Sequence, residues 1–83
     1  RMEDVYYWKN KGEVDFVIKN KNQKLIAINV SFSDEVDERE INSLLEFKKE
    51  FKSKVDKLII LTKNIEKRQG GIEFMLLWKW LLR

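Results

Sequence analysis

The 83-residue sequence predicts a small α/β domain with a mixed sheet, and three observations lead to that prediction. The first third of the chain contains β-rich runs in which apolar and polar residues alternate, as in the strands of a half-buried sheet. A stretch with helical spacing follows after Asp34. The continuously apolar run Leu58–Leu61 comes next, and after a helix such a run is typical of an interior strand that lies parallel to the preceding one. The predicted order is βββαβ, followed by a short C-terminal strand and helix.

The first three strands are predicted at Val5–Lys9, Glu13–Lys19 and Lys24–Ser33. The turn residues Asn10-Lys11-Gly12 and Asn20–Gln23 separate them, and such residues tolerate positive φ or form local turns. Side chains alternate between the two faces of a strand, so the even-numbered apolar residues should share one face. This main core face is predicted to consist of Val14, Phe16, Ile18, Ile26, Ile28, Val30 and Phe32.

A helix is predicted from about Glu38 to about Lys52, with Asp37 and Glu40 three residues apart as a capping box. We expect this helix to cover the even-numbered core face. The remaining elements are a polar loop, a short edge strand and a short apolar helix, at Lys63–Gly71, Ile72–Met75 and Leu76–Arg83 respectively.

The composition excludes several kinds of chemistry. The chain contains no cysteine and no histidine, which rules out disulfides, zinc sites built on these residues, cysteine nucleophiles and imidazole bases. No apolar run reaches the ~18 residues of a membrane span and no secretory signal is visible, so we expect a cytoplasmic protein without a membrane partner. The net charge of +3 permits contact with phosphates but does not form a dedicated basic stripe.

The most informative motif is Gly12-Glu13-Val14-Asp15-Phe16-Val17, followed after a turn by Ile28-Asn29-Val30-Ser31. A glycine, an E-[VI]-D-F strand and a strand reading I-E-V-K form the signature of the restriction-endonuclease-like, or PD-(D/E)XK, domain at the C-terminus of prokaryotic, notably archaeal, AAA-type ATPases. The sequence resembles that family, and Tyr6–Lys9 and Leu77–Leu82 extend the resemblance over nearly the whole chain. It implies that residues 1–83 are one restriction-endonuclease-like domain lacking the first helix, and the C-terminal part of a larger ATPase.

In that family the strand aspartate and the later acid hold a divalent cation, and the lysine assists the attacking water. The aspartate is kept here as Asp15, whereas Asn29 stands at the acid position and Ser31 at the lysine position. Glu13 is a potential substitute carboxylate, so a working site would hold its metal with Asp15 and Glu13. If the geometry is kept, Asp15 should lie across from Asn29 and Glu13 across from Ser31.

Three functions follow as hypotheses. The first is a non-catalytic nuclease-like module that binds no cofactor and contacts a protein or DNA. The second is a Mg²⁺-dependent DNA nuclease that uses Asp15 and Glu13 and recruits Lys11, Lys19 or Lys24. The third is a structural homodimerisation domain.

The terminal helix and one sheet face are the predicted contact regions. Without the first helix, the odd-numbered face with Val17, Leu25 and Ala27 should be covered by a second copy, by the rest of the ATPase or by the terminal helix. Trp78 and Trp80 are the candidate interface residues, because tryptophans on a terminal helix are commonly core or interface anchors. We expect a two-fold dimer.

Overall fold

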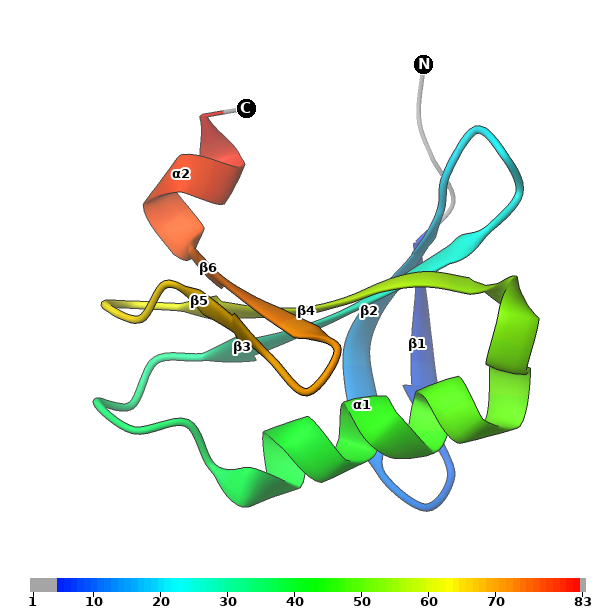
Figure 1. Cartoon of the computed structure of the whole chain (residues 1–83), viewed down its shortest axis with the longest axis horizontal. Helices are drawn as coiled ribbons and strands as arrows, with labels where there is room; N and C mark the ends of the chain where they lie inside the picture. The colour runs from blue at the N-terminus through cyan, green and yellow to red at the C-terminus, as the bar shows by residue number, and fades with distance from the viewer. Residues whose placement is uncertain (1–4, 83) are drawn as a thin grey trace.

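The computed structural model describes residues 5–82, which form a mixed sheet packed against one long helix (Figure 1). The strands are β1 (Val5–Lys9), β2 (Glu13–Lys19), β3 (Leu25–Ser31), β4 (Val55–Thr62), β5 (Lys67–Gln69) and β6 (Ile72–Leu76). The helices are α1 (Glu38–Phe51) and α2 (Leu77–Leu81), with a short 3-10 turn, η1 (Lys52–Lys54), after α1. This architecture confirms the predicted α/β class and the βββαβ order.

The strands are arranged in the order β1-β2-β3-β4-β6-β5. The pairs β1/β2, β2/β3 and β5/β6 are antiparallel, whereas β4 is parallel to both β3 and β6, as its continuous apolar run predicts. The last strand was expected at an edge and lies instead between β4 and β5. The reason is the turn at Gly70 and Gly71, whose positive φ values of 62° and 81° reverse the chain and pair β5 with β6.

Helix α1 begins and ends close to the predicted residues. The side chain of Asp37 accepts a hydrogen bond from the Arg39 backbone N–H at 2.9 Å and so caps the helix. The helix ends at Phe51 because Lys52 adopts a positive φ of 49°.

A β-bulge interrupts the pairing of β1 with β2. Tyr6 pairs with Val17 and Trp8 with Val14, so Tyr7 faces two residues of β2, Asp15 and Phe16. The extra residue breaks the alternation of side chains along β2. The prediction that Val14, Phe16 and Ile18 share one face is therefore wrong: Val14 joins Val17 in the core beneath α1, and Phe16 is 44% exposed.

The face of the sheet that α1 covers is the opposite of the one expected. Leu44 and Phe47 of α1 pack in one cluster with Val17 and Ala27, and Leu25 lies beside them. Ala27 is small and lets the helix approach the centre of the sheet, whereas the other face presents larger side chains such as Ile28. The odd-numbered face is therefore the closed core of the domain.

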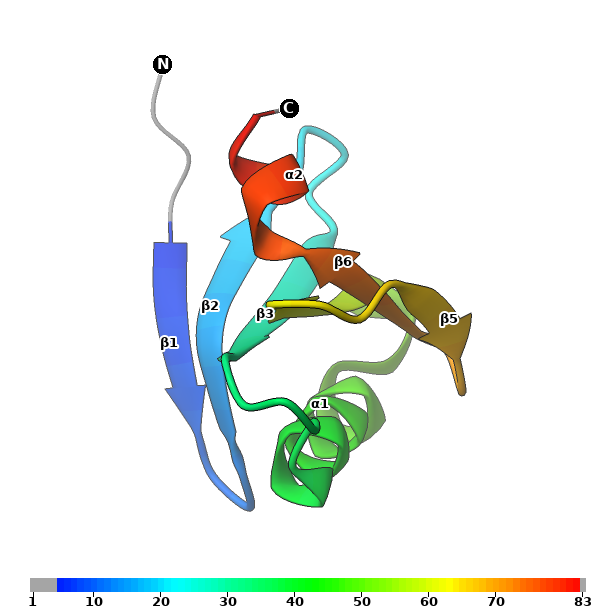
Figure 2. The ribbon, with the colours of Figure 1, turned by 90° about the vertical axis from the view of Figure 1, so that its left-hand side faces the viewer.

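The second face of the sheet, here called the α2 face, carries the smaller cluster of Ile28, Ile59 and Leu61. Figure 2 shows α2 on the side of the sheet opposite α1. Leu77 and Trp80 of α2 pack against this cluster, so the terminal helix does fold back onto its own chain, but over the even-numbered face. None of the helices in residues 5–82 is long and apolar enough to cross a membrane.

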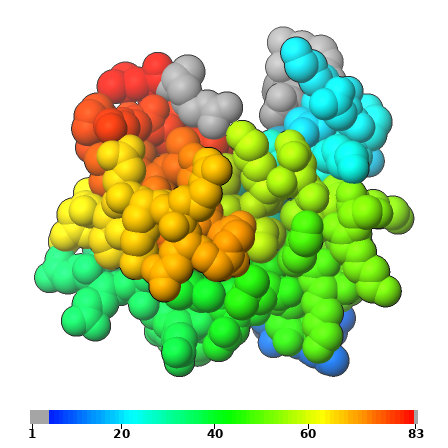
Figure 3. All heavy atoms as spheres, in the orientation of Figure 1, coloured from blue at the N-terminus to red at the C-terminus, as the bar shows by residue number. Residues whose placement is uncertain are grey.

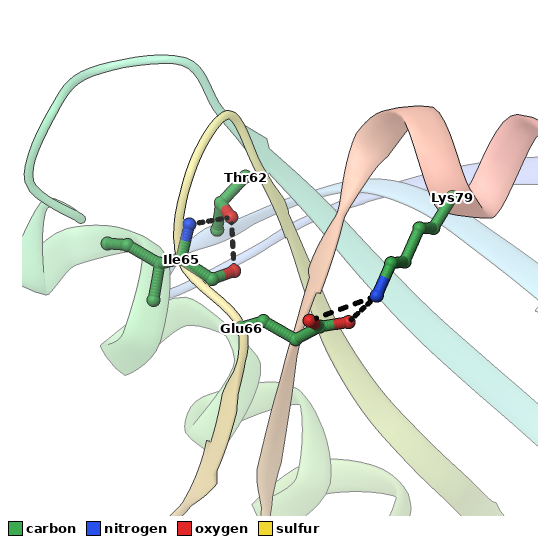
Figure 4. Close-up of polar contacts among 4 residues, drawn as sticks. All are labelled: Thr62, Ile65, Glu66 and Lys79. Carbon is green, nitrogen blue, oxygen red and sulfur yellow. Dashed lines mark hydrogen bonds and ion pairs between the residues drawn. The ribbon is translucent and has the colours of Figure 1, made fainter.

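Polar contacts hold α2 and the loop before β5 in position (Figure 4). The Lys79 ammonium lies 3.1 Å from both carboxylate oxygens of Glu66. The Thr62 hydroxyl accepts from the Ile65 backbone N–H at 2.9 Å and donates to the Ile65 carbonyl. The ion pair therefore links α2 to the loop before β5, and the two Thr62 hydrogen bonds close that loop at Ile65.

Candidate functional site

A hollow of about 640 Å³ lies between the β1–β2 turn and the first half of α1. The turn packs so closely on the helix at Gly12 that no side chain fits there. A Cβ atom added to Gly12 would lie 2.5 Å from Ser43 Oγ and 2.9 Å from Ser43 Cα. The Glu13 backbone N–H also donates to Ser43 Oγ at 3.1 Å. The lining residues are Lys11, Gly12, Glu13, Asp15, Arg39, Glu40, Asn42, Ser43 and Glu46.

Asn29 lies next to this hollow, and its side chain is fully buried between the sheet and α1. Its Nδ2 group donates to the Glu13 carbonyl and to the Glu40 carbonyl, at 3.2 Å in each case. Its Oδ1 atom accepts from the Asp15 backbone N–H at 2.8 Å. Both amide hydrogens are therefore used to tie the bulge of β2 to the first turn of α1, and a carboxylate could not make those two donor bonds.

Asp15 lies across from Asn29, as predicted. The pairs of β2 with β3 run from Phe16–Ile28 to Lys19–Leu25, and continuing this register brings Asp15 opposite Asn29. The Asp15 carboxylate does not project freely, because its Oδ2 atom accepts from the Val30 backbone N–H at 3.0 Å. This hydrogen bond takes the place of a backbone bond between β2 and β3 at the point where the bulge interrupts their pairing.

The other two motif positions are separated. Glu13 lines the hollow with Asp15, and its carboxylate lies 3.7 Å from the Lys9 ammonium. Ser31 is buried at the end of β3 beside Thr62 and does not line the hollow. The fold therefore brings Glu13 and Asp15 together, buries Asn29 beside them and leaves Ser31 apart.

The comparison with known families gives a match over nearly the whole chain. The family model described as a domain of unknown function, DUF4143, matches residues 1–80. The chain belongs to the DUF4143 family. No curated protein and no solved structure matches it. The function of this DUF4143 domain is therefore argued from its geometry.

Glu40 is the site residue that the sequence analysis did not identify, since it was read as part of a helix cap. Its pKa is raised above the ordinary value of 4.5, first by desolvation and then by the negative charges of Asp15, Asp37 and Glu13, while Arg39 opposes the shift. The pKa of the Tyr7 hydroxyl is also raised, first by desolvation and then by its hydrogen bond to Glu13. Both shifts report a negative potential around the hollow.

The residues of the hollow do not fit a catalytic divalent cation. Mg²⁺ prefers several oxygen ligands in octahedral geometry, with carboxylates among them. Asp15 is engaged with the β3 backbone, and the amide at position 29 turns its donors toward the protein. Among residues 5–82 no three acidic side chains are grouped so that they could hold a metal ion. Of the lysines considered for recruitment, Lys11 lines the hollow, whereas Lys24 donates to the Ser53 carbonyl elsewhere.

The two candidate interface tryptophans have different environments. Trp80 is half-buried and packs on the α2 face, so it belongs partly to the core. Trp78 is 55% exposed and lies 5.6 Å from the Lys79 ammonium, measured to the ring centre. Trp78 thus remains available to a partner.

Asn29→Asp should destabilise this DUF4143 domain at neutral pH. The new carboxylate would face the carbonyl oxygens of Glu13 and Glu40 without a donor, which costs roughly 1–3 kcal/mol or more in unfolding free energy. Burial raises the pKa of such a group, so stability is present at low pH and lost as the pH rises through the folded-state pKa. Urea denaturation at several pH values measures this.

Asn22→Asp in an exposed turn is the matched control and should change stability by less than about 0.5 kcal/mol. Equal stability of the two variants at neutral pH would refute the role of Asn29.

Glu40→Gln should stabilise the domain slightly at neutral pH. The raised pKa of Glu40 means that the folded state disfavours its charge, even though a helix N-terminus attracts negative charge. The gain should be at most about 0.5 kcal/mol for this partly exposed group, and it should vanish as the pH falls below 4.5 and Glu40 becomes protonated. Thermal melts across this pH range provide the measurement, with Glu35→Gln outside the hollow as the control. A loss of stability at neutral pH in Glu40→Gln alone would contradict the negative potential described above.

Proposed function

We propose that this DUF4143 domain is a non-catalytic nuclease-like module of an AAA-type ATPase, and that it serves as a contact surface. The observation that carries the proposal is the buried amide of Asn29. At the position where the resemblance to PD-(D/E)XK domains expects a metal-binding acid, the chain has a side chain whose two donor hydrogens hold Glu13 and Glu40 carbonyls. Asn29 therefore stabilises the contact between β2 and α1 and does not provide a metal ligand.

The remaining motif positions support the same conclusion. A working site would use two carboxylates on one cation and a lysine that offsets developing negative charge. Here Asp15 accepts a backbone hydrogen bond and Ser31 is buried away from the hollow. Each missing electrostatic group commonly costs about 2.7–4 kcal/mol of transition-state stabilisation, so the loss of two leaves little activity.

Domains of this family are commonly associated with AAA-type ATPases, which supports a role within a larger machine. A contact role is further supported by the large apolar side chains that the domain exposes. Val5, Tyr7, Phe16, Trp78, Leu81 and Leu82 are all 44% to 78% exposed. Contiguous exposed apolar surface on a small domain marks interaction sites.

DNA is the second candidate partner, favoured by a concentration of lysines at the end of the domain opposite the hollow. The β2–β3 turn and the segment after α1 lie side by side there, because Lys24 Nζ donates to the Ser53 carbonyl and Asn20 Nδ2 donates to Asp56. The lysines of the two segments are Lys19, Lys21, Lys24, Lys52, Lys54 and Lys57. Such lysines would contact phosphates without reading sequence.

A Mn²⁺ titration tests the non-catalytic role. We expect no binding tighter than about millimolar, because among residues 5–82 no three acidic side chains are grouped to hold a cation and Asp15 is engaged with the backbone of β3. Calorimetry of the wild type and of Asp15→Ala should give the same weak result. Supercoiled plasmid incubated with the protein and Mg²⁺ or Mn²⁺ should remain uncut, and slower migration of intact plasmid would identify contact with DNA.

Two results would reverse the proposal. One is sub-micromolar Mn²⁺ affinity that disappears in Asp15→Ala. The other is metal-dependent plasmid cleavage that is lost in Asp15→Ala and Glu13→Gln but kept in Glu46→Gln, which changes a carboxylate of the same hollow outside the motif. Either result would establish the nuclease that uses Asp15 and Glu13.

A further inference from the structure

The α2 face is covered over only one half of its width. Helix α2 contacts β4 and β6, and Figure 1 shows it next to β6 and away from β1. Within residues 5–82, α1 packs on the other face and α2 makes its main contacts with β4 and β6, so no helix covers the half formed by β1, β2 and the start of β3. Figure 3 shows a notch between α2 and the β2–β3 turn on the visible side of the molecule. The uncovered half exposes several large apolar side chains to water.

The uncovered half carries an apolar strip, here called the trough, which consists of Val5, Tyr7, Phe16, Ile18 and Ile26. Val5 pairs with Ile18 and Phe16 pairs with Ile28, and directly paired residues project from the same face. Tyr7 follows Val5 by two positions and so shares its face. Ile18 and Ile26 pack against the cluster on this face and form the floor.

Beside the trough, the outer side of α2 forms an apolar ridge. It consists of Trp78, Leu81 and Leu82, which are 55%, 70% and 78% exposed. Leu77 and Trp80 hold the helix to the sheet, and the ion pair of Lys79 with Glu66 fixes its orientation. The ridge is therefore a fixed feature of the surface and stands next to a trough on the same face.

We propose that the trough is filled by the ridge of a second copy of this chain, and that its own ridge fills the trough of that copy. The inference rests on the contact role proposed above and names the partner. A two-fold interface must be self-complementary, since each contact occurs twice with the roles exchanged. One face that carries the apolar ridge on one half and the apolar trough on the other meets this requirement about an axis through its centre.

The exposed apolar area agrees with what a stable dimer requires. Aromatic side chains carry roughly 150–250 Å² each and aliphatic ones roughly 60–120 Å², so the exposed parts of Val5, Tyr7, Phe16 and the three ridge residues sum to on the order of 500 Å². A standard interface buries about 800 Å² per partner, and homodimer interfaces are about 65% apolar, which again corresponds to about 520 Å².

Charge does not oppose this contact. Lys79 is paired with Glu66, and Lys9 at the end of the trough lies 3.7 Å from Glu13. Lys57 pairs with Ile26 and so projects from the same face, and its flexible side chain can keep the ammonium group in water at the edge of the contact. Because α1 lies on the opposite face of the sheet, the helix side of the hollow remains open in each copy.

The test uses the full 83-residue chain and sedimentation equilibrium from about 1 to 100 μM, the range expected for weak interfaces of this size. The wild type should sediment as a dimer of twice 10.1 kDa. Phe16→Lys in the trough and Leu81→Glu on the ridge should each raise the dissociation constant at least about 10-fold. Leu45→Lys, an exposed apolar site on α1, is the control and should leave the dimer unchanged.

Mixing the variants gives the sharpest result. In a pair made of one Phe16→Lys chain and one Leu81→Glu chain, one ridge–trough contact is fully wild type and the other places lysine against glutamate. The 1:1 mixture should therefore form a heterodimer at concentrations where each variant alone is a monomer. Urea denaturation verifies that both variants fold, and Tyr7→Lys replaces Phe16→Lys if that chain does not.

A monomeric wild type at about 100 μM, or a dimer insensitive to both substitutions, would overturn the proposal. So would a mixture of folded variants that stays monomeric. None of these outcomes bears on the non-catalytic role, which is decided by the Mn²⁺ and plasmid measurements.

Discussion

The fold depends on the buried amide of Asn29, which joins three elements at one point. It accepts from Asp15 where β2 bulges and donates to the Glu13 carbonyl and to the Glu40 carbonyl of α1. A bulge leaves backbone groups without ladder partners, and buried groups of that kind are costly unless they are bonded. The amide satisfies one such donor and two carbonyls, and in doing so it sets the distance between sheet and helix. The hollow and its negative potential follow from that geometry.

The same arrangement divides the domain into two functional sides. The odd-numbered face is closed by α1 and provides the main core, so it is the side that gives stability. The α2 face is half covered by a five-residue helix and keeps large apolar side chains in contact with water. A chain of this size buries only about 60% of its unfolded surface, so one well-packed face with one open face is a natural outcome. This open face is the one that we propose a partner covers.

Local patterns in the sequence predicted the elements and the register between β2 and β3. The apolar run at Leu58–Leu61 predicted β4, and the resemblance to PD-(D/E)XK domains implied that Asp15 would face Asn29. The bulge could not be predicted, because at Glu13 and Asp15 the backbone of β2 bonds to the side chain of Asn29, which is distant in sequence. The error in the face covered by α1 has the same origin, since periodicity identifies two faces but does not say which one the helix will approach. Glu40 was missed as a site residue because its surroundings come from other strands. The resemblance to PD-(D/E)XK domains remains a prediction about ancestry.

Hydrogen exchange of the Asn29 side-chain amide tests the account most directly. In a sample labelled with ¹⁵N at asparagine, both Asn29 side-chain hydrogens should exchange as slowly as backbone amides of the core, because each is buried and bonded to a carbonyl. The side chain of Asn42, exposed on α1 beside the hollow, provides the reference in the same spectrum and should exchange rapidly. If Asn29 exchanged as fast as Asn42, the amide would be free to turn toward the hollow, and the structural role assigned to it would be contradicted.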